Sequence, residues 1–581
     1  MGDLKMFIAE KTAQSGNWQS FERNICRLLV FEGYHGVRIV GQSGDKGADI
    51  IASKHNKRWL FQAKYWKAKV GIGVVDETLK ALKEYNAHIP VIVSANGFDE
   101  ETKKYHHSLL ARGIPLQLWD MQQLINRVRR LPPVHINKYK PRPYQEDAIS
   151  SIVQAFVNAN ENSALIVLAT GLGKTFVAAE AIRRILCNQY NKVLVLAHTN
   201  PLVYQLEKSF WTFMTPSQKT VVWNGYEKPS PADMNSADIV FACINTVFDH
   251  ITKGLDMPNF GIVIVDECHH AGSEMYQTVL DYMLAGQADG IFSLGMTSTP
   301  WRPDESDITK YFGTPRIQVD IVTGMKKGFL ANVDYRMHTD NIDWNALKNI
   351  NGKKFSAKQI NKTLFINQWD DAVVSELQET WKEQSKPRAI VFCGTIDHAV
   401  TMRNKINALG FCNAAAVFSQ SNAGLSMTQF ERNRILSDFS DGVVNVICAV
   451  DVFNEGIDVP DVNILVFQRV THSRRIFIQQ LGRGLRISEG KDKVIVLDFV
   501  SDIRRFAAGI DLKSQLEGGR TEKEIIRIDL PNKVTFKRAG SEDKETESFL
   551  RIWLDDVVAI ENADEDASVL KFPPPIPGGR I

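Results

Sequence analysis

Two series of continuous apolar runs constrain the fold of this chain more than any other feature. The first series, between about residues 141 and 310, includes "ALIVLAT", "KVLVLAH", "DIVFAC", "GIVIVDE" and "GIFSLGMTS". The second, between about residues 330 and 510, includes "RAIVFCG", "AAAVFS", "VNVICAV", "NILVFQ" and "KVIVLDFV". Unbroken Val, Ile and Leu, separated by helical patterns, are typical of strands buried on both faces of a parallel sheet. We therefore predict two similar α/β halves in tandem.

A glycine-bearing loop in the first half predicts a phosphate-binding site. The stretch "ALIVLATGLGKTFVAAEAI" indicates a strand, a loop and a helix, and the loop contains Thr170, Gly171, Gly173, Lys174 and Thr175. Glycines let the backbone wrap closely around phosphates, and the following helix offers free N–H groups. We expect Lys174 to pair with the β- and γ-phosphates of ATP and the Thr175 hydroxyl to ligate Mg²⁺.

Further polar residues of the same half suit ATP chemistry. Asp266 and Glu267 end the apolar run "GIVIVDE". A carboxylate at this position can hold Mg²⁺ through water, and its neighbour can polarise the attacking water. Arg142 and Gln145 lie just ahead of the phosphate loop and suit the adenine base.

The order of five motifs resembles superfamily 2 helicases and translocases. They are "ATGLGKT", "DECH", "TSTPWR", "AVDVFNEGIDVPDV" and "QQLGRGLR", within residues 141–510. Leu168 replaces the first glycine of the strict phosphate-loop pattern, and the chain fits the helicase form A-x-x-G-x-G-K-T instead, with Ala169 first. The resemblance implies that Asp266 and Glu267 form the Walker B pair. It also implies that Thr297 and Thr299 couple hydrolysis to movement.

The same resemblance assigns residues of the second half. It places Asp458 in the "NEGIDVP" motif, has Gln479 lead the last motif, and makes Arg483 and Arg486 arginine fingers. A guanidinium group suits this role because it spreads positive charge over the departing γ-phosphate. The resemblance implies that ATP binds in the cleft between the two halves.

The motifs indicate the type of nucleic acid less specifically than they indicate ATP. "TSTPWRPD" and "SRRIFIQQLGRGLR" look like the DNA translocases of restriction and repair systems, whereas "DECH" also occurs in RNA-sensing relatives. We predict duplex DNA as the preferred partner. Thr199 and Thr246 are candidate donors to the nucleic-acid backbone, and strand-end capping is an almost equal reading of both hydroxyls.

Residues 1–130 have a net positive charge, whereas the rest of the chain does not. They contain 20 Lys and Arg against 13 Asp and Glu, whereas the whole chain has a net charge of only +2. A basic domain suits a polyanionic partner. "FERNICRLLVFEGY" predicts an amphipathic helix, and "VRIV", "ADIIA", "WLFQA", "VIVSA" and "LQLW" predict short strands.

Polar residues interrupt the predicted hairpin at residues 47–66. Alternation along a strand puts Gln62 and Lys64 on one face, and Asp49 lies just inside the partner strand. Phosphodiester hydrolysis needs oxygen ligands for a divalent metal and a cation near the attacking water or leaving group. Asp49, the strand carbonyl at position 63 and Lys64 can supply these parts, and Glu22 on the first helix can add a metal contact.

The pattern Glu, "GDKGADIIA", "FQAK" and "VIVSANGF" over residues 15–130 resembles the Mrr-like branch of the PD-(D/E)xK restriction endonucleases. In that branch a Gln takes the place of the usual Glu before x-Lys. The resemblance implies that Asp49, Gln62 and Lys64 form the core of the site, with Glu22 as a helix-borne acid. The alternative is an inactive nuclease fold that only binds DNA, in which Asp49 and Lys64 form a cross-strand ion pair.

Together these patterns predict an α/β chain with a restriction-endonuclease-like domain followed by two tandem RecA-like parallel-sheet domains. The expected limits are 1–130 for the nuclease, 131–140 for a linker, 141–325 and 326–510 for the two motor lobes, and 511–581 for a segment of unknown role. We expect an ATP-dependent DNA helicase or translocase fused to a metal-dependent DNA endonuclease, with ATP and Mg²⁺ as cofactors. The alternatives are a DNA-dependent ATPase whose front domain only binds DNA and an RNA-sensing ATPase.

The biological setting is predicted from the architecture and the composition. Restriction or defence against foreign DNA, with possible partner proteins of a defence system, fits a motor joined to a nuclease. No run of about 18 or more apolar residues occurs, so we expect no membrane span. The seven cysteines contain no C-x-x-C pair, and the N-terminus lacks a secretory pattern, so a cytoplasmic location is expected.

Overall fold

The computed structural model describes the chain in segments that together contain three β-sheets. The described residues are 7–8, 17–40, 47–132, 139–158, 161–188, 191–285, 290–298, 308–319, 323–324, 327–337, 367–418, 427–450, 462–468, 487, 491 and 493–499. The expected site residues Thr299, Asp458, Gln479, Arg483 and Arg486 lie outside them, as do most of the expected linker and all of residues 511–581. The chain divides into two compact units, of which the first holds two of the sheets.

The N-terminal part of the first unit is a five-stranded mixed sheet in the order β1-β2-β3-β4-β5. Strands β1, β2 and β3 pair antiparallel, whereas β3, β4 and β5 pair parallel. Its elements are α2 (Trp18–Phe31), β1 (His35–Ile39), β2 (Ile50–Lys54), β3 (Lys57–Lys64), α3 (Ile72–Glu84), β4 (Ile89–Ser94), α4 (Glu100–Ala111), β5 (Gln117–Trp119) and α5 (Met121–Arg129).

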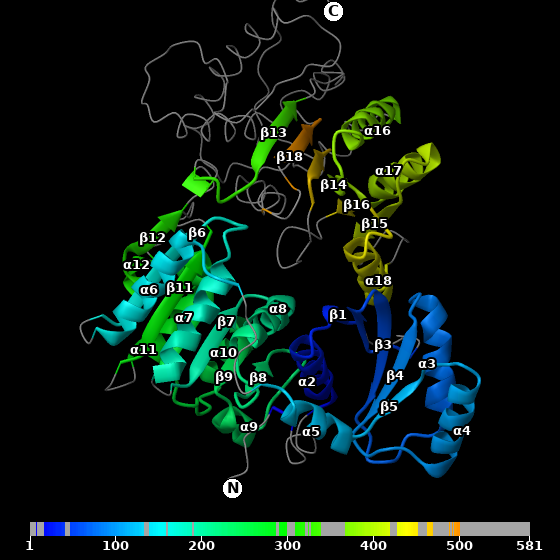
Figure 1. The fold of residues 1–581 in the computed structure, drawn as a ribbon. Helices are drawn as coiled ribbons and strands as arrows, with labels where there is room; N and C mark the ends of the chain where they lie inside the picture. The colour runs from blue at the N-terminus through cyan, green and yellow to red at the C-terminus, as the bar shows by residue number, and fades with distance from the viewer. Residues whose placement is uncertain are drawn as a thin grey trace, which may run out of the picture. The chain divides into compact units, whose positions relative to one another are not determined.

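Helices α2 and α3 cover opposite faces of this sheet, as Figure 1 shows. Ile25 and Leu29 of α2 belong to one core cluster with Phe61, because alternation along β3 points Phe61 towards α2. Ala81 of α3 packs with Leu60 on the other face. The alternation therefore directs Gln62, two residues after Leu60, towards α3.

The second sheet of the first unit has seven strands in the order β12-β6-β11-β10-β7-β9-β8. The pairings from β6 through β8 are parallel, as the continuous apolar runs predict. Its strands are β6 (Ser163–Leu168), β7 (Val193–Ala197), β8 (Thr220–Trp223), β9 (Ile239–Cys243), β10 (Ile262–Asp266), β11 (Phe292–Thr297) and β12 (Pro315–Val319). The helices are α6 (Pro143–Val157), α7 (Lys174–Asn188), α8 (Asn200–Phe210), η1 (Trp211–Phe213), α9 (Pro231–Ser236), α10 (Ile244–Thr252), η2 (Cys268–Gly272), α11 (Glu274–Ala285) and α12 (Thr309–Phe312).

The second unit contains a six-stranded sheet in the order β13-β18-β17-β14-β16-β15. All of its pairings are parallel, which confirms the α/β prediction for the second half. The elements after β12 are β13 (Asn332–Met337), α16 (Asn367–Trp381), β14 (Ala389–Phe392), α17 (Ile396–Leu409), β15 (Ala414–Phe418), α18 (Gln429–Ser440), β16 (Val446–Val450), β17 (Ile464–Phe467) and β18 (Lys493–Asp498). None of the helices in the described segments is both long and apolar enough to span a membrane.

A buried ion cluster within the first unit joins α2 to the seven-stranded sheet. The Arg23 side chain of α2 donates to Glu207 of α8 at 2.7 Å and also to Glu227. All three side chains are at most 5% exposed. Burial alone would lower the pKa of Arg23, but the two carboxylates raise it above its ordinary value. Trp211 of η1 packs into the same apolar cluster as α2, so charge and apolar contacts both fix this helix.

We expect Arg23→Ala to destabilise the first unit by about 3–5 kcal/mol, because it leaves two buried carboxylates without their cation. Chemical denaturation of the whole chain, monitored by tryptophan fluorescence, measures the loss of stability. Arg112→Ala is the control, since Arg112 is exposed at the end of α4. Equal midpoints for the two variants would contradict a stabilising role for the ion cluster.

Candidate functional site

The phosphate loop follows the buried strand β6 and leads into α7, which begins at Lys174. Gly171 and Gly173 have φ values of 94° and 85°, in the left-handed region that favours glycine. A Cβ atom on Gly173 would lie 2.8 Å from Nε2 of Gln145. Because glycine has no side chain, Gln145 can pack directly against the loop. This geometry brings Gln145 of α6, expected at the adenine, against the phosphate loop.

Lys174 and the two acids at the end of β10 form a charged cluster, in which Asp266 is buried and the side chains of Lys174 and Glu267 are 11% and 17% exposed. Nζ of Lys174 lies 3.3 Å from Oε1 of Glu267. Glu267 adopts the left-handed conformation with φ 48°, which is uncommon for a residue with a side chain and is often found at functional sites. Burial would raise the pKa of Glu267, but the Lys174 ammonium and the neighbouring His269 ring hold it well below its ordinary value.

Asp266 differs from Glu267 in its electrostatic environment. Burial, followed by the charge of Glu267, raises the pKa of Asp266 to about 6. Within the described residues, its buried Oδ1 atom has no hydrogen-bond partner. A buried carboxylate oxygen without a donor suits a hydrated divalent cation, whose charge would favour the ionised form. The carboxylate oxygens at this site therefore fit the predicted Mg²⁺.

His269 is a residue of this site that the sequence analysis did not single out. Its Nδ1 atom lies 2.9 Å from Oγ1 of Thr297 and 3.3 Å from Oε2 of Glu267. Thr297 ends β11, which runs parallel to β10, so the ring connects the ends of two adjacent strands. The signal was present in the first histidine of "DECHH", but only the fold shows that Thr297 is its partner.

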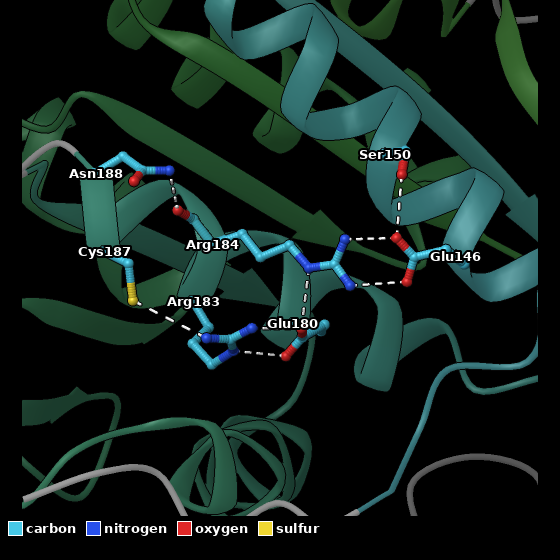
Figure 2. Close-up of polar contacts among 7 residues, drawn as sticks. All are labelled: Glu146, Ser150, Glu180, Arg183, Arg184, Cys187 and Asn188. Carbon is cyan, nitrogen blue, oxygen red and sulfur yellow. Dashed lines mark hydrogen bonds and ion pairs between the residues drawn. The ribbon is translucent and has the colours of Figure 1, made fainter.

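An ion-pair network fixes α6 against α7 and is drawn in Figure 2. Arg184 of α7 makes two contacts with Glu146 of α6, at 2.6 and 2.7 Å, and a third with Glu180 of its own helix. Arg183 contacts the carboxylate of Glu180 and the sulfur of Cys187, both on α7. Glu146 adjoins Gln145, so Arg184 ties the expected adenine helix to the helix that begins at Lys174.

We expect Arg184→Ala to weaken ATP binding about two- to fivefold, because a partly exposed ion pair contributes up to about 1 kcal/mol. Titration with a fluorescent ATP analogue measures the affinity. Arg183→Ala is a matched control, since it removes a pair that lies within α7 and leaves the link to α6 intact. Equal affinities for the two variants would show that the link between the helices does not support the nucleotide site.

The hairpin of β2 and β3 holds the expected nuclease residues. Oδ2 of Asp49 accepts the backbone N–H of Ala63 at 2.6 Å, which places this carboxylate between the positions of Gln62 and Lys64 along β3. Asp49 and Gln62 are buried, and Lys64 is partly exposed. Glu22 is buried on α2, the helix on the face of the sheet opposite to α3.

An acid that the sequence analysis missed contacts two of these residues. Nε2 of Gln62 donates to Oε2 of Glu77 on α3 at 2.8 Å, and Nζ of Lys64 lies 3.9 Å from the same oxygen. No local spacing connects Glu77 with "FQAK", so the sequence held no signal for this contact. Among the described residues, no group of three or more His, Cys, Asp or Glu side chains is placed to hold a metal ion.

A mixed sheet followed by two RecA-like sheets, the first of them with a phosphate loop, is the arrangement expected of a nuclease domain joined to helicase domains. Comparison with known families agrees. "Restriction endonuclease" of the Mrr type matches residues 13–128, "Type III restriction enzyme, res subunit" matches 138–302, and "Helicase conserved C-terminal domain" matches 371–488. The chain therefore contains an Mrr-like restriction endonuclease domain followed by two domains of helicase type.

Individual relatives are distant. The helicase IRC3 of Saccharomyces cerevisiae is 22% identical over 74% of this chain and 61% of its own length. The Type I restriction enzyme EcoAI endonuclease subunit of Escherichia coli is 28% identical over 63% of this chain and 47% of its own length. The DNA-bound Type ISP restriction-modification enzyme LlaBIII shares the fold, with a TM-score of 0.52 and 15% identity over 94% of this chain and 42% of that one. The chain thus spans about half of the length of these proteins.

Proposed function

We propose that this chain is an ATP-driven DNA translocase joined to a metal-dependent DNA endonuclease. The observation that carries the proposal is the cluster of Lys174, Asp266 and Glu267, behind a domain of restriction-endonuclease type. In this proposal the nuclease occupies residues 1–130 and the motor residues 141–510. Relatives named as restriction subunits and helicases support the pairing of the two activities.

In the motor, each residue of the cluster has a separate task. Lys174 pairs with the β- and γ-phosphates in place of its contact with Glu267, and Thr175 and Asp266 hold the Mg²⁺ of MgATP. Glu267 is then free to accept a proton from the attacking water. Arg142 and Gln145 contact the adenine. Mg²⁺ supplies charge neutralisation for the phosphates when it is bound.

The motifs of the second half add further residues to the proposal. Gln479, Arg483 and Arg486 are assigned to the γ-phosphate by their motif, together with Asp458. Thr297 and Thr299 relay hydrolysis to movement, and Thr199 and Thr246 contact the DNA backbone. Such contacts do not depend on base sequence. Thr199 suits this role because it is exposed at the N-cap of α8, where its side chain makes no capping hydrogen bond.

In the nuclease, Asp49 and the carbonyl of Ala63 are proposed metal ligands, with Glu22 as a further acid. Lys64 stabilises the charge on the attacked phosphate. The charge pattern supports a DNA partner, because residues 1–130 hold 20 Lys and Arg against 13 Asp and Glu. Restriction or defence against foreign DNA, with partner proteins of such a system, is the proposed biological role.

We expect Glu267→Gln to retain ATP binding while hydrolysis falls about 10²–10⁴-fold, because the substitution removes only the proton acceptor. Lys174→Ala is expected to lose both binding and hydrolysis. Measurements with duplex DNA, with duplex RNA and with neither polymer identify the activator. Full ATPase activity of Lys174→Ala would remove the phosphate-loop assignment, and stimulation by RNA alone would favour the RNA-sensing alternative.

We expect Asp49→Ala and Lys64→Ala each to abolish plasmid cleavage in the presence of Mg²⁺ while DNA-stimulated ATPase activity persists. Gel analysis of supercoiled, nicked and linear DNA measures the cutting. The same plasmid with EDTA tests the dependence on metal. Intact plasmid with wild-type protein under every condition would favour a front domain that only binds DNA.

A further inference from the structure

Gln62 occupies the position where a carboxylate would provide negative charge for a metal, yet its amide is fully engaged elsewhere. The side chain is 0% exposed. Its Oε1 atom accepts the hydroxyl of Thr78, and its Nε2 atom donates to Glu77 at 2.8 Å. Both partners lie on α3. These two contacts fix the plane of the amide and direct its N–H group at the carboxylate of Glu77.

Glu77 lies against β3 and against Gly47 ahead of β2, at the end of the hairpin where Asp49 lies. A Cβ atom on Gly47, two residues before Asp49, would lie only 2.5 Å from Cγ of Glu77. The aliphatic part of the Glu77 side chain therefore packs against the backbone at Gly47. Its carboxylate contacts Gln62 and Lys64, the neighbours of Ala63 on β3. Ala63 in turn donates its N–H group to Asp49. The two acids therefore share one small region of the hairpin.

The chemistry of a divalent metal indicates what this arrangement achieves. Mg²⁺ in phosphate-processing sites is commonly held by one or two carboxylates together with water and substrate phosphate. Gln62 contributes no charge, which leaves Asp49, immediately before β2, as the one acid of the hairpin segment 47–64. The Glu77 side chain is 47% exposed and can therefore meet solvent, metal and DNA.

We propose that Glu77 supplies the second carboxylate of the nuclease site, and that Gln62 holds it in place. The carboxylate that the strand lacks is thus provided from α3 through a hydrogen bond. The inference rests on the proposed nuclease function. Glu77 also neutralises part of the charge of Lys64, which keeps that ammonium beside the hairpin until phosphate arrives.

Metal binding to the whole chain without nucleotide tests the proposal, with Mn²⁺ as the probe and its electron paramagnetic resonance signal as the readout. The site lost in Asp49→Ala defines the nuclease metal. We expect Glu77→Gln to weaken that same site at least tenfold, and plasmid cleavage to fall with it. Glu101→Gln, an exposed change on α4, is the matched control and is expected to bind as wild type.

A double variant separates a ligand from a merely structural acid. The double variant Gln62→Glu with Glu77→Gln returns the carboxylate to β3. It keeps a hydrogen bond between positions 62 and 77, with the amide donor now at position 77 and the carboxylate acceptor at position 62. We expect it to recover Mn²⁺ binding relative to Glu77→Gln alone. Circular dichroism verifies that each variant is folded.

The outcomes distinguish this inference from the nuclease assignment itself. Unchanged Mn²⁺ affinity in Glu77→Gln, with the site still lost in Asp49→Ala, overturns the role of Glu77 and leaves the nuclease site in place. If Asp49→Ala loses no Mn²⁺ site at all, both assignments are overturned. Failure of the double variant to regain Mn²⁺, while folded, also counts against Glu77 as a ligand.

Discussion

A charge that is removed from water must be compensated, and this constraint governs every site of the described chain. At the end of β10, Lys174 and His269 offset the charge of Glu267, whereas Asp266 keeps a raised pKa. The same rule explains Arg23, which is buried only because carboxylates of α8 and of the segment after β8 surround it. Each of these clusters lies where a strand or helix of the first unit meets its neighbour.

The nuclease hairpin meets the same constraint in a different way. A fully buried carboxylate at position 62 would need a cation, whereas the neutral amide of Gln62 is satisfied by Thr78 and Glu77. The negative charge is then carried by Glu77, whose half-exposed side chain remains hydrated. The neutral Gln62 side chain thus allows this part of β3 to be buried while the acid Glu77 stays beside it. Helix α2 adds a further connection, because Glu22 and Arg23 are adjacent and Arg23 binds Glu207 of α8.

The sequence predicted most strands of all three sheets because those strands are buried and therefore continuously apolar or regularly alternating. It did not predict β8 or β13, and it missed β12, an exposed edge strand that begins with a proline. The sequence predicts the phosphate loop and Asp266 as a site because chemistry fixes their spacing along the chain, and the structure places Lys174 of this loop beside Glu267. Glu77 could not, since α3 meets β3 only through tertiary packing, and neither the Thr297–His269 contact nor the Arg23 cluster follows any local pattern.

The central claim, that one chain couples a DNA motor to a nuclease, is tested most directly by cleavage of linear, forked, modified and unmodified DNA. Each substrate is incubated with wild-type protein and Mg²⁺, with ATP, with a non-hydrolysable analogue and without nucleotide. The account predicts that at least one substrate is cut, and that cutting requires hydrolysable ATP. Cleavage that proceeds equally without ATP, or intact DNA in every reaction despite DNA-stimulated hydrolysis, would contradict it.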